Sequence, residues 1–180
     1  MNKIIFLGGI PGTGKTTLAY KLALEYKIDK VISLDILKTV LKEYENDSYI
    51  NTTTHEAYKI DNLSVIDGFL KHSKIINDYF YKFIKKFNDK VMIVEGATIT
   101  KEFTRLFQEE EVCYINLVVD EQEELVRRYK EKMKLRKSKW LDNLDNILEI
   151  DAYLKSQADI NINGVNFKEV EEFINGSLFL

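Results

Sequence analysis

The chain has 180 residues, of which 45% are hydrophobic and 31% charged, and its net charge is −3. This length suits one domain around one buried core, and the composition argues against a disordered or fibrous chain. A negative net charge supplies no general attraction for nucleic acid, so we expect nucleic acid to be an unlikely partner.

The first segment predicts a strand, a glycine loop and a helix in that order. Residues 3–7 form a short apolar run with β-branched side chains, which is typical of a buried parallel strand, and the run stops at Gly8. From Lys15 onward apolar residues recur at helical spacing, so a helix should begin where the glycine loop ends. This is the order that a phosphate-binding loop requires.

The next segments predict two more strands that end near carboxylates. Residues 31–34 read as a strand, after which Asp35 is a plausible N-cap for a helix. A polar stretch and then a long helical pattern follow, from about residue 56 to 87, interrupted near Gly68. Residues 91–94 predict a third strand, which ends in Glu95. Asp35 and Glu95 should therefore lie at the same edge of a parallel sheet.

The last third of the chain continues the alternation of strands and helices. Residues 112–119 predict a fourth strand around Cys113, the single cysteine, which we expect to be a buried and unreactive thiol. Residues 120–123 resemble a capping box that opens a charged helix, and residues 140–154 continue helically. A short strand at 160–162 precedes a terminal helix. The pattern predicts an α/β fold with helices on both faces of a parallel sheet.

Residues 9–16 fit the P-loop pattern G-x-x-x-x-G-K-[ST] in every position, between a predicted strand and a predicted helix. Glycines let backbone N–H groups surround phosphates, and the helix N-terminus adds partial positive charge. We expect the loop to bind ATP with Mg²⁺, with Lys15 at the β and γ phosphates and Thr16 at the metal. The predicted nucleotide-binding residues are Gly9, Ile10, Pro11, Gly12, Thr13, Gly14, Lys15, Thr16 and Thr17.

Several classes that use glycine loops are disfavoured by the sequence. A dinucleotide fingerprint is excluded because Thr17 stands where G-x-G-x-x-G requires its last glycine. The chain has no N-K-x-D run for guanine recognition and no signature of transporter ATPases, and it is short for a ring-forming ATPase. A compact phosphotransferase remains.

The chain resembles the 2-phosphoglycerate kinase branch of the small P-loop kinases, a wider group that includes gluconate kinases, polynucleotide kinases and zeta toxins. Besides the P-loop, the resemblance rests on residues 32–41, 51–59, 94–97 and 140–154. It implies a three-layer P-loop NTPase fold with a five-stranded parallel sheet and the P-loop strand at its centre. It also implies one kinase domain over residues 1–180, an acceptor pocket near Asp35 and an arginine-bearing helical lid at about residues 121–140.

Two carboxylates have candidate roles in such a site. Asp35 would accept the proton of an acceptor hydroxyl and orient it for attack, although a helix cap is the simpler interpretation. Glu95 resembles the carboxylate that holds Mg²⁺ through water, and its alternative is a charge at a strand end that faces solvent.

Basic and hydroxyl side chains supply the remaining candidates. Arg128 and Arg136 are expected to neutralise charge during transfer, with a solvated helix face as the alternative. Residues with a predicted substrate role are Asp35, Thr53, Thr54, Lys101, Arg105 and Arg127. Thr53 could equally start a helix, because it forms a capping-box pattern with Glu56.

The sequence thus predicts an ATP- and Mg²⁺-dependent phosphotransferase that acts on a small hydroxylated or phosphorylated acceptor, resembling 2-phosphoglycerate. A polynucleotide 5′-hydroxyl kinase and a nucleotide-gated binding switch without kinase activity are the alternatives. No stretch is long enough for a signal peptide or a membrane span. We therefore expect a cytoplasmic monomer or homodimer with no membrane contact.

Overall fold

The computed structural model describes residues 2–134, 139–164 and 166–178. Its strands are β1 (Lys3–Gly8), β2 (Lys30–Ser33), β3 (Val91–Glu95), β4 (Glu111–Val118) and β5 (Ile160–Asn163). They form one sheet in the order β2-β3-β1-β4-β5, and every adjacent pair is parallel. The predicted five-stranded parallel sheet, with the P-loop strand at its centre, is confirmed.

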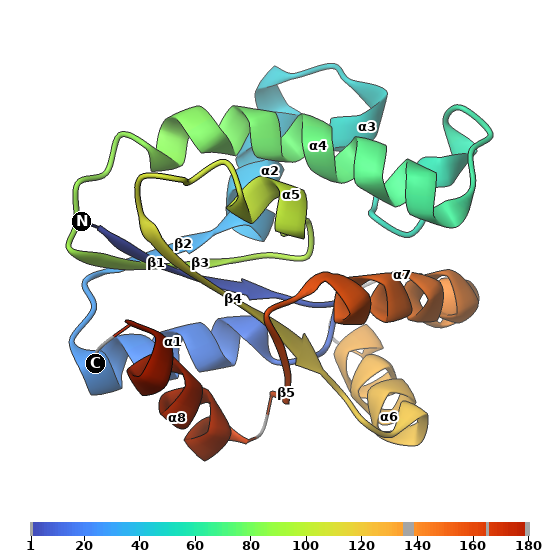
Figure 1. The fold of residues 1–180 in the computed structure, drawn as a ribbon. Coiled ribbons are helices and arrows are strands. Elements are labelled where there is room, and N and C mark those ends of the chain that lie inside the picture. Colours follow the sequence, from blue (N-terminus) through green and yellow to red (C-terminus); the bar gives the residue numbers. More distant parts are fainter. Residues whose placement is uncertain (1, 135–138, 165, 179–180) are drawn as a thin grey trace.

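Helices cover both faces of the sheet (Figure 1). The helices α1 (Lys15–Tyr26) and α8 (Phe167–Leu178) lie on one face. The other face carries α2 (Leu34–Tyr44), α4 (Val65–Ile84) and α5 (Lys101–Thr104), with the short α3 (Ser48–Asn51) beside them. The α/β three-layer class predicted from the sequence is therefore confirmed.

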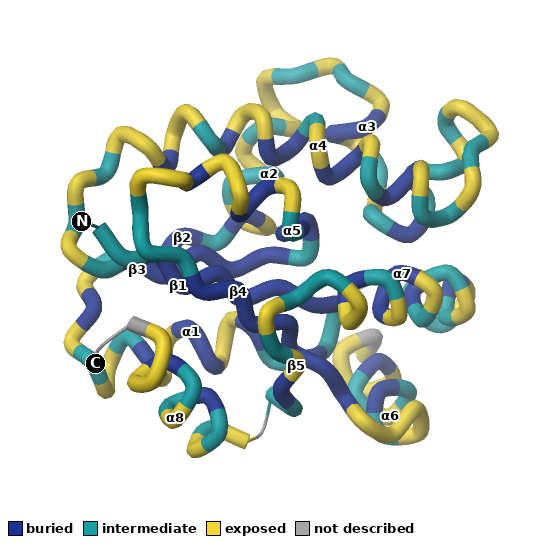
Figure 2. The backbone as a smooth tube through the Cα atoms, in the orientation of Figure 1, coloured by how far each residue is buried: buried dark blue, intermediate teal, exposed yellow. Residues whose placement is uncertain are grey.

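The alternation of side chains along the buried strand β1 divides the core into two layers. Ile4 and Phe6 pack with α4 and α5, whereas Ile5 and Leu7 pack with α1 and α8. All four side chains are almost completely buried, and the strands form the dark centre of Figure 2. A strand covered on both faces must be apolar at every position, which explains the continuous hydrophobic run.

A third apolar cluster lies beyond the carboxyl ends of the strands. It joins the P-loop residue Ile10 to α4, to α6 (Gln122–Met133) and to α7 (Leu144–Gln157). Tyr129 on α6 is fully buried in this cluster, and its hydroxyl donates a 2.9 Å hydrogen bond to the carbonyl of Pro11. The helix of the predicted lid is thus packed directly against the P-loop.

Some predicted boundaries are wrong. The long helix does not break at Gly68: α4 begins at Val65, after a short 3-10 turn at Ala57–Lys59. A Cβ on Gly68 would come within 2.3 Å of the Cα of Tyr58. Glycine at this position in α4 therefore allows the 3-10 turn to pack closely against the helix. Residues 141–143 form a separate 3-10 turn before α7.

Two predicted helix caps are also wrong. Asp35 is the second residue of α2, whose N-cap is Ser33, so the Asp35 side chain is free for other contacts. The N-cap of α6 is Glu121, and no side chain there accepts a capping hydrogen bond. Acidic residues stabilise the first turn of a helix through its dipole without acting as caps, which explains the resemblance of residues 120–123 to a capping box.

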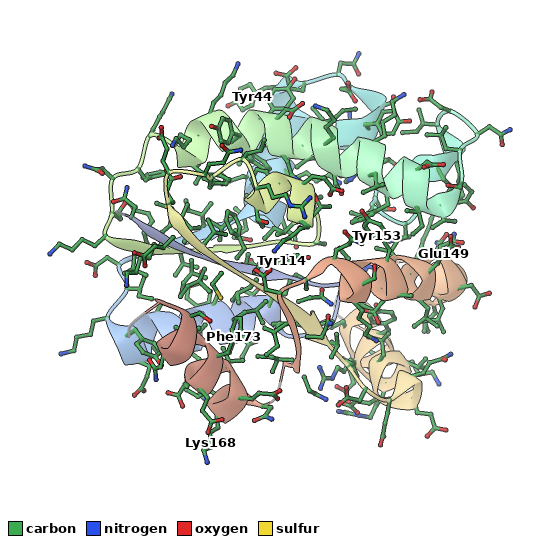
Figure 3. All side chains as sticks on the ribbon, in the orientation of Figure 1. Tyr44, Tyr114, Glu149, Tyr153, Lys168 and Phe173 are labelled. Carbon is green, nitrogen blue, oxygen red and sulfur yellow. The ribbon has the colours of Figure 1, made fainter. Side chains whose placement is uncertain are left out.

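Tyr114, at the centre of Figure 3, shows why β1 ends in glycine. A Cβ on Gly8 would lie 2.7 Å from the Cε2 atom of Tyr114, and the Tyr114 hydroxyl donates to the carbonyl of Ile99 at 3.0 Å.

Among residues 2–134, 139–164 and 166–178, no helix is long and apolar enough to cross a membrane.

Candidate active site

The P-loop leaves the carboxyl end of β1 and wraps into the first turn of α1. Gly9, Gly12 and Gly14 all have positive φ angles. A Cβ on Gly9 would meet the carbonyl oxygen of Leu117 at 2.4 Å, and one on Gly12 would meet the Tyr129 ring at 2.8 Å. The loop is therefore confined by β4 and α6. Gly9 and Gly12 adopt the positive φ angles that the loop needs, and they lack a side chain that would clash with these elements.

Lys15 extends back along this loop. Its Nζ donates a 2.9 Å hydrogen bond to the carbonyl of Ile10, and the residue is only 6% exposed. Burial lowers the pKa of Lys15, and the nearby carboxylates of Asp35 and Glu95 oppose that shift. A buried ammonium group next to a backbone cradle is suited to bind phosphate oxygens.

Glu95 ends β3, the strand next to β1, and is 1% exposed. Its Oε1 accepts a 3.2 Å hydrogen bond from the Thr16 hydroxyl, while its buried Oε2 has no hydrogen-bond partner among the described residues. Burial raises the pKa of Glu95. The alternative of a solvent-facing charge is therefore wrong, because the strand end lies beneath α1.

The oxygens of Thr16 and Glu95 fit a magnesium ion. Mg²⁺ prefers hard oxygen ligands and retains several waters, so one hydroxyl and one nearby carboxylate suffice on the protein side. In the described part of the chain, no group of three or more His, Cys, Asp or Glu side chains could hold a metal by itself. The unpartnered Oε2 of Glu95 would gain a partner from a water bound to the ion.

A cleft of about 500 Å³ joins the P-loop to α2 and to the segment after α3. Its lining contains the P-loop residues Pro11, Gly12, Gly14, Lys15, Thr16 and Thr17. Asp35, Thr53 and Thr54 also line it, so residues far apart in the sequence meet here. The exposed Asp35 accepts a long 3.4 Å hydrogen bond from the backbone N–H of Ala97. Thr53 donates to Glu56 at 3.0 Å, but no helix starts at Thr53.

Three of the predicted substrate residues lie elsewhere. Lys101 forms an ion pair with Asp159, and Arg105 is exposed after α5. Arg127 pairs with Glu124 and Glu131 on the outer face of α6. None of the three lines the cleft.

Arg128 is differently placed from its neighbour, since successive helical residues point about 100° apart. Its Nη1 donates to the carbonyl of Gly12 at 3.1 Å, and its Nε donates to Glu124 at 2.8 Å. Arg128 therefore contacts the P-loop directly. Arg136, the other predicted lid arginine, lies outside the described residues.

The chain matches the family model described as an AAA domain over residues 5–151. The chain belongs to this family. A 2-phosphoglycerate kinase of Pyrococcus horikoshii is 27% identical over 96% of this chain and 62% of its own length. That of Pyrococcus furiosus is 29% identical over 86% of this chain and 55% of its own length. The chain thus spans somewhat more than half the length of these relatives.

Other similar proteins are also small-molecule kinases. A mevalonate-3-phosphate 5-kinase of Thermoplasma acidophilum is 31% identical over 42% of this chain and 40% of its own. The shikimate kinase of Acinetobacter baumannii, solved with shikimate, aligns over 100% of this chain and 97% of its own, with a TM-score of 0.59 and 17% identity. That likeness shows the fold. The predicted resemblance to the small P-loop kinases is confirmed, and the relatives support a P-loop phosphotransferase.

Sequence reasoning missed several residues of this AAA-domain cleft. Ser33, Lys38, Lys132 and Trp140 line it. Ser33 is the N-cap of α2, and Lys38 lies one helical turn after Asp35. A helix predicted to start at residue 34 would therefore have placed both residues near Asp35. Lys132, on α6, had no signal that distinguished it from the other lysines of that helix.

Proposed function

We propose that this chain transfers the γ-phosphoryl group of ATP, in the presence of Mg²⁺, to a hydroxyl of a small hydroxylated or phosphorylated acceptor. The observation that carries the proposal is that Lys15, Thr16 and Asp35 open onto one cleft. A P-loop without an opposing carboxylate would serve binding or hydrolysis equally well. An exposed aspartate across the cleft supplies a group that can orient an acceptor hydroxyl.

The residues on the nucleotide side would bind and neutralise the phosphates. The backbone N–H groups of the loop and the Lys15 ammonium would contact the phosphate oxygens. Thr16 and, through water, Glu95 would hold Mg²⁺, which when bound supplies positive charge to the transferring phosphoryl group. Arg128 is our candidate for a lid contact with that group, because its guanidinium already reaches the carbonyl of Gly12.

Asp35 would act on the acceptor side. Its carboxylate would accept a hydrogen bond from the acceptor hydroxyl and take its proton as the new O–P bond forms. Phosphoryl transfer is loose, so positioning matters more than a strongly basic carboxylate. Thr53 and Thr54 also line the cleft. Thr54 would donate a hydrogen bond to the acceptor, and Thr53, whose hydroxyl donates to Glu56, would accept one.

The relatives favour a small acceptor over a polynucleotide. The relatives are named as kinases of 2-phosphoglycerate and of mevalonate 3-phosphate, which are small hydroxylated phosphate esters. We therefore place a 2-phosphoglycerate-like acceptor first among the candidates.

The direct test is ADP release from ATP and Mg²⁺, with and without each of four acceptors: 2-phosphoglycerate, a sugar acid, a nucleoside and a 5′-hydroxyl oligonucleotide. We expect 2-phosphoglycerate or the sugar acid to stimulate release. Preferential stimulation by the oligonucleotide would establish the polynucleotide kinase instead. Slow release that no acceptor changes, together with tight ATP binding, would favour the nucleotide-gated switch.

A further inference from the structure

A basic side chain in the cleft has no acidic partner. Lys38 lies one helical turn after Asp35 on α2, and its Nζ contacts the carbonyl of Thr52 at 2.6 Å and Nε2 of His72 at 2.8 Å. Within the described residues, no carboxylate forms an ion pair with Lys38. An ammonium group has three N–H donors, so these two neutral partners leave one donor available.

His72 keeps Lys38 in this position from the opposite helix. It is completely buried on α4, and burial, followed by the charge of Lys38, holds its pKa well below the usual range. A neutral imidazole can accept from Lys38 through Nε2 only if Nδ1 carries the hydrogen, and Nδ1 is buried without a described partner. His72 therefore holds the lysine without neutralising its charge.

A second imidazole, that of His55, lies near enough to Lys38 for the lysine's charge to act on it. His55 lines the cleft, is 3% exposed, and neither of its ring nitrogens has a hydrogen-bond partner among the described residues. Burial lowers its pKa, so the neutral ring offers one N–H donor. A buried polar group without a partner is costly unless a ligand or water satisfies it.

We propose that Lys38 and His55 form a second anion subsite, separate from the P-loop, that binds an oxyanion group of the acceptor. This inference rests on the proposed function and deepens it. The ammonium of Lys38 would supply charge and one hydrogen bond, and His55 would supply a second hydrogen bond. Thr54, which precedes His55 and lines the same cleft, offers a hydroxyl.

The charges of the cleft agree with two anionic ligands. Lys15, Lys38 and Lys132 line it, whereas Asp35 is the single carboxylate in the lining formed by the described residues. This local excess of positive charge stands in a chain of net charge −3. The charge of the Asp35 carboxylate acts on both Lys15 and Lys38, so an acceptor hydroxyl bound at Asp35 would lie near both lysines.

The test measures anion binding without turnover. With the P-loop filled by Mg²⁺ and a nonhydrolysable ATP analogue, inorganic phosphate and acetate are titrated separately by calorimetry. The variants are Lys38→Gln, Lys38→Arg and His55→Phe. Lys90→Gln, at an exposed lysine whose charge is not among those that act on Lys38, is the control. Thermal unfolding of each variant verifies that it folds.

We expect phosphate to bind the wild type and Lys90→Gln equally, about tenfold more weakly to Lys38→Gln and His55→Phe, and nearly normally to Lys38→Arg. Tighter binding of acetate than phosphate would assign the subsite to a carboxylate. Equal binding to wild type and folded Lys38→Gln would overturn the subsite, as would no binding of either anion to the wild type. Anion binding without any phosphoryl transfer would retain the subsite and refute the proposed kinase.

Discussion

The Nζ atom of Lys15 donates a 2.9 Å hydrogen bond to the carbonyl oxygen of Ile10, five residues earlier in the same loop. The lysine therefore rests on the backbone of the loop in which phosphates would bind. The ammonium has two further N–H donors for phosphate oxygens, and a charged acceptor forms the stronger hydrogen bond.

Replacing Lys15 by Gln should impair both nucleotide binding and transfer. Glutamine keeps a donor but loses the charge that stabilises the transferring phosphoryl group, so kcat should fall roughly 10²–10³-fold. Steady-state kinetics and titration with an ATP analogue measure the two effects. Lys90→Gln, an exposed position at the other end of β3, is the control and should be neutral. Unchanged kcat in Lys15→Gln would remove this lysine from the mechanism.

Replacing Asp35 by Asn should separate chemistry from nucleotide binding. The amide oxygen can still accept from the N–H of Ala97, so the local structure should persist. Without a proton acceptor, kcat should fall about 10²–10⁴-fold, while the affinity for the ATP analogue changes little. If affinity falls and kcat does not, Asp35 is a structural residue.

Replacing Glu95 by Gln should stabilise the ligand-free protein. Burial raises the pKa of Glu95, so its ionised form is less favourable in the fold than in the unfolded chain, and its contribution to stability is lost as pH rises through that pKa. At pH 7 the neutral amide avoids this cost, and the thermal midpoint should rise by roughly 2–4 °C for each kcal/mol.

The same Glu95→Gln variant should require more Mg²⁺ for half-maximal activity. The amide holds metal-bound water less strongly than a carboxylate does. A magnesium titration of the reaction rate measures this. A lower thermal midpoint together with an unchanged magnesium requirement would contradict both parts.

Replacing Gly164 by Ala should displace the P-loop backbone at Thr13. The added Cβ would lie 2.1 Å from the carbonyl oxygen of the buried Thr13, so the backbone must shift. We expect destabilisation of about 1–3 kcal/mol and weaker binding of the ATP analogue. Gly176→Ala on α8 is the control, because nothing lies within 4 Å of its Cβ position, and this change should stabilise the helix slightly. Equal behaviour of the two variants would show that the contact with Thr13 is unimportant.

Binding of a phosphate monoester at Lys38 should weaken as pH rises through about 8. Burial lowers the pKa of Lys38 to about 8, Lys42 adds to this shift, and Asp35 opposes it. The imidazoles of His55 and His72 are neutral throughout this range, and a monoester is already a dianion above its second pKa of about 6.

Methyl phosphate titrated between pH 7 and 9.5, with the P-loop filled, measures this dependence. Lys38→Arg should abolish the pH dependence, because guanidinium stays protonated. Affinity that stays constant across this range in the wild type would contradict a titrating Lys38 in the subsite.

The nucleotide side of the site could be predicted from the sequence because its signal is local. Eight consecutive residues specify the P-loop, and the apolar runs before Asp35 and Glu95 place both carboxylates at the carboxyl edge of the sheet. In a parallel sheet those ends converge, so their meeting with Lys15 follows from topology.

The acceptor side could not be predicted in this way. Lys38 lies on α2 and His72 on α4, and no spacing in the sequence indicates that their side chains meet. Charge alone also did not identify which basic residues line the cleft. Lys101, a predicted substrate residue, pairs with Asp159, whereas Lys132, which was not predicted to have a role, lines the cleft. Such contacts depend on tertiary packing rather than on local pattern.

The strand order gives the two halves of the cleft different resistance to local unfolding. The P-loop follows β1, which is hydrogen-bonded on both sides, whereas Asp35 and Lys38 follow β2 at an edge of the sheet. Edge strands open with less free energy than central ones, so amide hydrogens of Val31 and Ile32 should exchange with solvent faster than those of Ile5 and Phe6. The part of the cleft lined by Asp35 and Lys38 should therefore open locally more readily than the P-loop does.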